Sequence, residues 1–178
     1  RLITGTMEAH SEAEAAFAAF AGFPAAALFS TGYAANLGML TALCGKNDSV
    51  LLDADAHASL YDGCQMSGAT VYRFRHNDVA ALEKRLQRLG EAAQDCLIVV
   101  EGLYSVLGDC APLEPIVELK ERFGATLLVD EAHSLGIYGE NGCGVAERDG
   151  VLDRVDFVVG TFSKSLGAMG GFCASPHP

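Results

Sequence analysis

One lysine stands apart from the others in its surroundings. The chain has four: Lys46 lies in a polar turn, Lys84 and Lys120 lie on amphipathic helical stretches, and Lys164 directly follows an apolar run and precedes small residues. An ammonium group placed among apolar and neutral groups is disfavoured, which lowers its pKa and makes the amine a usable nucleophile. We therefore take Lys164 as a candidate nucleophile. The alternative is a strand-end lysine that reaches into solvent.

Polar and ionisable residues follow three successive apolar runs, which end at Val100, Val129 and Val159. The following segments are Glu101-Gly102-Leu103-Tyr104-Ser105, Asp130-Glu131-Ala132-His133 and Gly160-Thr161-Phe162-Ser163-Lys164-Ser165. In parallel sheets flanked by helices, ligands bind beyond the carboxyl ends of the strands. The three segments are therefore expected to meet at one edge of a sheet and to form one site.

The second of these segments adds an acid and an imidazole. Asp130 ends a buried run, and an unpaired carboxylate is costly to bury, so it needs a cationic partner. That partner is either a structural cation of the protein or a protonated ring nitrogen of a cofactor. His133, three residues later, places an imidazole near the same ligand. This proximity favours the functional interpretation of Asp130.

A glycine turn opens a helix at Thr31-Gly32-Tyr33-Ala34-Ala35-Asn36. The free N–H groups of a first helical turn, together with the helix dipole, favour a phosphate group. The pattern is weak alone because many helices begin this way. The hydroxyl groups of Thr161 and Ser163, at a neighbouring strand end, are candidates for the same phosphate.

Several other classes of protein are excluded by what these motifs lack. The box Asp130-Glu131-Ala132-His133 occurs in helicases, but no G-x-x-x-x-G-K-[ST] loop accompanies it. No G-x-S-x-G elbow of a hydrolase and no G-x-G-x-x-G dinucleotide loop is present. A net charge of -11 opposes binding to nucleic acid or anionic lipid. The six cysteines form no C-x-x-C pair, so we expect reduced thiols in a cytoplasmic protein and no metal site.

Helical and strand periods alternate along the whole chain. The predicted helices span residues 8–22, 33–43, 57–67, 112–123 and a stretch capped by Asp78, and the predicted strands span 49–52, 70–74, 96–100, 126–129, 157–159 and 171–174. Continuous apolar strands between amphipathic helices predict an α/β fold, a three-layer αβα arrangement around a mostly parallel sheet. No charged-then-apolar leader opens the chain, and its start at Arg1 suggests a fragment of a longer protein.

Taken together, the motifs resemble the α-oxoamine synthases, which are fold-type I enzymes dependent on pyridoxal 5′-phosphate (PLP). The resemblance covers essentially the whole chain, with the motifs in the order of the family. They are Asp53-Ala54-Asp55-Ala56-His57-Ala58-Ser59, His76-Asn77-Asp78, Glu101-Gly102-Leu103-Tyr104-Ser105, Asp130-Glu131-Ala132-His133 and Gly160-Thr161-Phe162-Ser163-Lys164.

The resemblance implies a role for each candidate residue toward PLP. Lys164 forms the Schiff base, Asp130 pairs with the ring nitrogen, and His57 stacks on the ring. His133 bonds the phenolic oxygen, with Ser105 close to it. Backbone groups of Gly32 and Tyr33 and the hydroxyls of Thr161 and Ser163 hold the phosphate. Without the resemblance, His57 is only a histidine at a helix start.

The resemblance also implies a reaction: an amino acid is condensed with an acyl-CoA, with loss of CO2, to give a 2-amino ketone. The segment Gly160–Ser165 is most similar to the serine palmitoyltransferase branch, which predicts L-serine, a long acyl chain and 3-ketosphinganine. Other branches remain open: 8-amino-7-oxononanoate synthase, 2-amino-3-ketobutyrate CoA ligase and the oxoamine synthases of natural-product assembly. A non-catalytic regulatory subunit with this fold is the alternative of another class, and the presence of Lys164 argues against it.

The family implies more protein than these 178 residues. We expect residues 1–178 to form the PLP-binding large domain, incomplete, without the N-terminal segment and the C-terminal small domain of the family. The family also works as a homodimer whose active sites lie between subunits. We therefore expect little or no activity from these residues alone.

Overall fold

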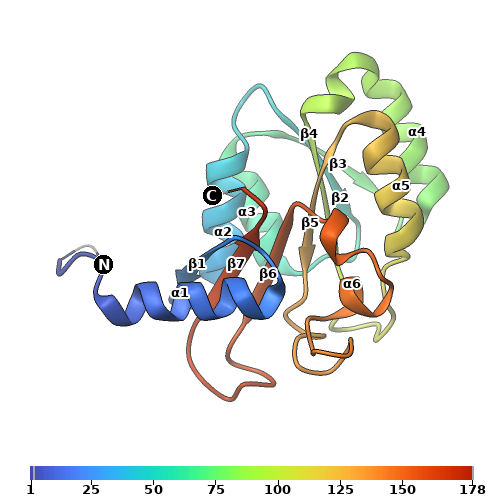
Figure 1. The fold of residues 1–178 in the computed structure, drawn as a ribbon. Coiled ribbons are helices and arrows are strands. Elements are labelled where there is room, and N and C mark those ends of the chain that lie inside the picture. Colours follow the sequence, from blue (N-terminus) through green and yellow to red (C-terminus); the bar gives the residue numbers. More distant parts are fainter. Residues whose placement is uncertain (2, 178) are drawn as a thin grey trace.

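A computed structural model of the chain describes residues 1 and 3–177. It forms one seven-stranded sheet with helices on both faces (Figure 1). The strands are β1 (Ala25–Phe29), β2 (Ser49–Asp53), β3 (Thr70–Phe74), β4 (Cys96–Glu101), β5 (Thr126–Asp130), β6 (Phe157–Thr161) and β7 (Gly171–Ser175). The helices are α1 (Glu8–Ala21), α2 (Gly32–Leu43), α3 (Ala58–Ser67), α4 (Val79–Leu89), α5 (Leu113–Phe123) and the short α6 (Val145–Arg148).

The strand order is β1-β7-β6-β5-β4-β2-β3, and the central pairs from β6 to β3 are parallel. Only β7 runs against its neighbours β1 and β6. The predicted α/β fold with a mostly parallel sheet is therefore confirmed. The order also places the carboxyl ends of β4, β5 and β6 side by side, which is the condition for one shared site.

The sheet separates two apolar cores because successive side chains of a strand point to opposite faces. Leu51, Ile98 and Leu127 pack with α4 and α5 on one face. Leu52 and Val99, their neighbours in sequence, pack with α2 and α3 on the other. Strands that are buried on both sides read as continuous apolar runs, which is why the sequence showed them so clearly.

Strand β1 was not predicted. Its sequence, Ala25-Ala26-Ala27-Leu28-Phe29, has no β-branched residue, and alanine is depleted in strands. It forms at the edge of the sheet because it pairs in antiparallel register with β7, Ala25 facing Ser175. The predicted helix ends were close: Gly22 ends α1 in the left-handed conformation, and the Asp78 side chain caps α4 through the N–H of Ala81. Among the described helices, none combines the length and apolarity needed to cross a membrane.

Candidate active site

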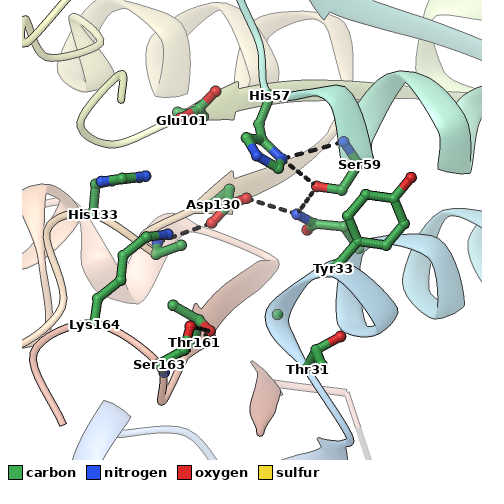
Figure 2. Close-up of a pocket in the computed structure, with 13 residues that line it drawn as sticks. Thr31, Tyr33, His57, Ser59, Glu101, Asp130, His133, Thr161, Ser163 and Lys164 are labelled. Carbon is green, nitrogen blue, oxygen red and sulfur yellow. Dashed lines mark hydrogen bonds between the residues drawn. The ribbon is translucent and has the colours of Figure 1, made fainter. Parts of the chain in front are cut away.

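A cavity of about 210 Å3 opens at the carboxyl edge of the sheet (Figure 2). It is bounded by the first turn of α2, the start of α3 and the segments that follow β4, β5 and β6. Its lining residues are Thr31, Gly32, Tyr33, Asn36, His57, Ser59, Glu101, Asp130, Ala132, His133, Thr161, Ser163 and Lys164. The prediction that the strand ends share one site is therefore met by the geometry of the chain.

Eight of the nine predicted site residues line this cavity, and Ser105 does not. Ser105 is exposed, in the loop that follows β4. Five lining residues were given no site role from the sequence: Thr31, Asn36, Ser59, Glu101 and Ala132. Asn36 and Ser59 could not be recognised because they lie on helices whose packing the sequence does not reveal. Glu101 was signalled only by its place after an apolar run.

Lys164 follows β6, and its side chain extends into the cavity toward Asp130 (Figure 2). Among the described residues, its amine takes part in no hydrogen bond or ion pair. Lys164 is exposed overall, but partial desolvation of its amine lowers the pKa, although the charges of Asp130 and Glu101 oppose this shift. The amine is therefore uncharged at a lower pH than that of an ordinary lysine, as a nucleophile requires.

Asp130 ends β5 and is 4% exposed. Its carboxylate accepts from two groups: the Asn36 amide donates to Oδ2 over 2.7 Å, and the backbone N–H of Ala132 donates to Oδ1 over 2.9 Å. These bonds fix the orientation of the carboxylate. Since no described cation of the protein forms an ion pair with Asp130, the structural salt bridge that the sequence left open is absent from the described residues.

Glu101 is the register partner of Asp130 on the neighbouring strand β4 and is 2% exposed. Burial and the nearby charge of Asp130 raise the pKa of Glu101 to about 7, although hydrogen bonds from the backbone N–H groups of His57 and Ser105 lower it.

In His133, burial and the positive charge of Lys164 lower the pKa, whereas the charge of Asp130 raises it. The imidazole of His133 is therefore neutral near pH 7 and can donate or accept one hydrogen bond.

The first turn of α2 forms a cradle for an anion. The Thr31 side chain caps the helix by accepting from the N–H of Ala34 over 2.9 Å, and the Thr31 carbonyl accepts from Ala35. The N–H groups of Gly32 and Tyr33 have no hydrogen-bond partner within the described part of the chain. Facing them, Thr161 Oγ1 and Ser163 Oγ lie 3.0 Å apart. Two backbone donors, two hydroxyls and a helix N-terminus form a donor set that suits a phosphate group.

Comparison with known proteins agrees with this geometry. The family pattern "Aminotransferase class I and II" matches residues 1–178. A serine palmitoyltransferase of Caulobacter vibrioides is 56% identical over 177 residues, which are 99% of this chain and 44% of that protein. An 8-amino-7-oxononanoate synthase of Geobacter metallireducens is 46% identical over 98% of this chain and 44% of its own length.

The solved structure of serine palmitoyltransferase from S. paucimobilis, with a bound PLP–myriocin aldimine, superposes with a TM-score of 0.95 at 53% identity. The match covers 100% of this chain and 44% of that one. The chain thus spans less than half the length of the relatives that it matches. The predicted resemblance to the α-oxoamine synthases, nearest to the serine palmitoyltransferase branch, is confirmed.

Proposed function

The chain belongs to the class I and II aminotransferase family, and from this premise we propose that it is the PLP-binding large domain of a serine palmitoyltransferase. One observation carries the proposal. A single cavity brings together the amine of Lys164, whose pKa is lowered, the carboxylate of Asp130 and the anion cradle at the start of α2. These are the three groups that an aldehyde, a pyridine nitrogen and a phosphate on one molecule require.

The residues of the cavity fit PLP. The phosphate is assigned to the N–H groups of Gly32 and Tyr33 and to Thr161 and Ser163, whose hydroxyls face the first turn of α2. Gly32 has no side chain to fill the cradle, and a Cβ there would lie 2.7 Å from Cβ of Thr161. Asp130, held by two donors, is suited to keep a proton on the ring nitrogen. When bound, PLP supplies an electron sink for negative charge at the α-carbon of an amino acid.

Each side chain of the cavity then has its own role in the proposed reaction. Nζ of Lys164 would hold the aldehyde carbon of bound PLP, and the same atom, when free, would accept the α-proton of the amino acid. His133, as a neutral imidazole, would hydrogen-bond the phenolic oxygen of PLP, and His57 would cover its ring. The α-carbon of serine becomes bonded to the thioester carbonyl carbon of a long-chain acyl-CoA, with release of CoA and CO2. The product is a 2-amino ketone, 3-ketosphinganine.

The test uses the intact protein that contains this chain. PLP should give it a near-visible absorption that disappears on borohydride treatment, and Lys164→Ala should abolish the borohydride-stable attachment. Lys84→Ala, on the exposed side of α4, is the matched control and should behave as wild type. An intact protein that binds no PLP would contradict the proposal, and would favour the alternative of a non-catalytic regulatory subunit.

The second candidate function is 8-amino-7-oxononanoate synthase, because a relative with that name is 46% identical over nearly the whole chain. The two candidates share the chemistry and differ in their substrates. Assays of the intact protein with serine, glycine and alanine, each against short-chain and long-chain acyl-CoA, separate them. Serine with a long-chain acyl-CoA should give the highest kcat/KM.

We further propose that the intact protein is a homodimer in the cytoplasm. Large apolar side chains are exposed in the loops that follow Glu101 and Lys164: Val106 (91%), Leu107 (54%), Leu166 (50%) and Met169 (88%). Such side chains at the edge of a site suit burial by a second subunit. All six cysteines are free thiols, as expected in a reducing compartment. Light scattering and cell fractionation test the two points.

A further inference from the structure

A buried series of hydrogen bonds joins Asp130 to His57, two residues that lie on different elements (Figure 2). The Asn36 amide nitrogen donates to Asp130 Oδ2 over 2.7 Å and to Ser59 Oγ over 2.9 Å. Ser59 Oγ lies 2.7 Å from His57 Nδ1. Asn36 and Ser59 are 3% and 1% exposed. Bonds that are this well shielded from water are stronger and more costly to break than surface ones.

The direction of the first two bonds follows from the chemistry of the acceptors. A carboxylate oxygen only accepts, so the atom of Asn36 that faces Asp130 is the amide nitrogen. The opposite orientation would set the amide oxygen against the carboxylate. The two hydrogens of that nitrogen are then shared between Asp130 and Ser59. Ser59 Oγ therefore accepts from Asn36, and its own hydrogen is free for another partner.

That partner is His57 Nδ1. The same nitrogen also accepts from the backbone N–H of Ser59 over 3.2 Å, since the His57 side chain is the N-cap of α3. A backbone N–H can only donate. Two donors therefore point at Nδ1, which leaves the ring proton on Nε2.

We propose that Asn36 and Ser59 are positioning residues that hold His57 in its Nε2–H tautomer and fix its ring at the cavity. The consequence for catalysis rests on the proposed function, in which His57 covers the cofactor ring. The structural part stands independently of it. With both residues in place, the orientations of Asp130 and His57 depend on each other, although the two side chains come from β5 and the start of α3.

Close packing of α3 on α2 makes this series of bonds possible. A Cβ at Gly63 would lie 2.7 Å from Cδ1 of Leu40 and 3.1 Å from the backbone oxygen of Asn36. Glycine at this position therefore lets the two helices approach until the side chains of Asn36 and Ser59 meet. A larger residue would separate them.

The test is 15N NMR of the imidazole of His57 in the intact protein labelled with 15N-histidine, before and after removal of PLP. His57→Asn identifies the signals. Wild type should show an unprotonated Nδ1 and a protonated Nε2 in both states. Ser59→Ala removes the shorter of the two donors, and Asn36→Asp replaces the amide donor by an acceptor that competes for the Ser59 hydroxyl. Both variants should therefore populate the second tautomer, and Ser59→Thr should restore the first.

Ser67→Ala is the matched control, because it makes the same substitution on the same helix, where the Ser67 hydroxyl bonds the carbonyl of Cys64 away from the cavity. It should leave the His57 signals unchanged. In the PLP-loaded protein, Ser59→Ala should lower kcat/KM for serine by roughly 10-fold, the scale of one buried hydrogen bond left unsatisfied. A protonated Nδ1 in wild type, or signals unchanged in both variants, would overturn the proposal. An intact protein that binds no PLP but shows the predicted tautomer would overturn only the proposed function.

Discussion

The backbone of Gly32 lies directly against the side chain of Thr161. A Cβ at Gly32 would be 2.7 Å from Cβ and 2.9 Å from Oγ1 of Thr161. Gly171, the register partner of Thr161 on β7, is so close that a Cβ there would lie 2.6 Å from the nitrogen of Gly32. The start of α2 thus packs closely on the paired residues Thr161 and Gly171, and this close approach requires that position 32 lacks a side chain.

Gly32→Ala should therefore displace Thr161 or the first turn of α2. We expect the Kd of the intact protein for PLP to rise about 5- to 150-fold, as misplaced donors and overpacking of about 1–3 kcal/mol imply. Fluorescence or absorbance titration measures it. Gly45→Ala, just beyond the other end of α2, meets only Asp48 Oδ2 at 3.8 Å and is the control. Equal PLP affinity in both variants would show that the close approach of Gly32 to Thr161 does not matter.

The lowered pKa of Lys164 predicts how PLP uptake depends on pH. Uptake by the PLP-free intact protein needs the uncharged amine, so its rate should rise with pH and reach half its maximum below pH 10.5. Glu101 opposes the lowering through its negative charge. Glu101→Gln should therefore shift the midpoint to still lower pH. Stopped-flow absorbance measures both profiles, and a shift to higher pH in Glu101→Gln would contradict this electrostatic account.

Much of this site was predictable because it depends on order along the chain. Lys164, Asp130 and Thr161 end or follow apolar strands, and parallel strands bring such ends together whatever the details of packing. Asn36 and Ser59 were not predictable in this way. Their contact requires the approach of α2 and α3, which depends on a glycine facing another helix. Strand β1 was missed because its alanine-rich sequence has little strand propensity, and it is a strand only through its pairing with β7.

Glu101 predicts a pH-dependent stability. Its folded pKa of about 7 lies above its ordinary value of 4.5, so the folded state binds the extra proton. The stabilisation is full below pH 4.5 and is lost as pH rises to about 7, by an amount on the order of a few kcal/mol. Glu101→Gln removes this loss. In denaturant unfolding, the free energy of unfolding of Glu101→Gln relative to wild type should be higher at pH 8 than at pH 5. For the exposed Glu118→Gln, this difference should be the same at both pH values.

His76 links three loops at the same edge of the sheet. It bonds Asp53 over 2.9 Å and Asp109 over 3.0 Å, lies 3.9 Å from Asp55, and its ring makes a T-shaped contact with that of Tyr104. Burial lowers the pKa of His76, but the hydrogen bonds and charges of Asp53 and Asp109 outweigh it, and the pKa is raised above 6.5. Both oxygens of Asp53 are taken, since Oδ2 accepts from the N–H of Asn77 and Oδ1 from that of Asp55.

A raised folded pKa means that His76 stabilises the protein fully below pH 6.5 and loses this effect as pH rises through the folded value. Asp109→Asn should lower the pKa of His76, measured by NMR titration. The stability advantage of wild type over Asp109→Asn should shrink between pH 6 and pH 9, as measured by denaturant unfolding. Asp153→Asn, at an exposed position away from this cluster, should change neither quantity. A stability advantage of wild type over Asp109→Asn that grows with pH would contradict this account of His76.

Glu131, which directly follows Asp130 in the sequence, has a structural role. It is 0% exposed, and its carboxylate accepts from the Ser134 hydroxyl, from the N–H of Val145 over 3.0 Å and from that of Ala146 over 2.8 Å. A Cβ at Gly102 would lie 2.0 Å from Oε2 of Glu131. The carboxylate thus fills the space left by a glycine and holds the loop that carries His133.

Glu131→Gln keeps the size of the side chain but turns one accepting oxygen into a donor that faces other donors. We expect it to destabilise the protein by about 1–3 kcal/mol, the cost of buried groups left without partners. Gly102→Ala should destabilise it by a similar amount through overpacking. Glu131→Ala removes the side chain that a Cβ at position 102 would overlap, so the double variant Gly102→Ala/Glu131→Ala should cost less than the sum of its two single variants. Denaturant unfolding of wild type and these three alanine variants measures the coupling, and strictly additive losses would show that Gly102 does not make room for Glu131.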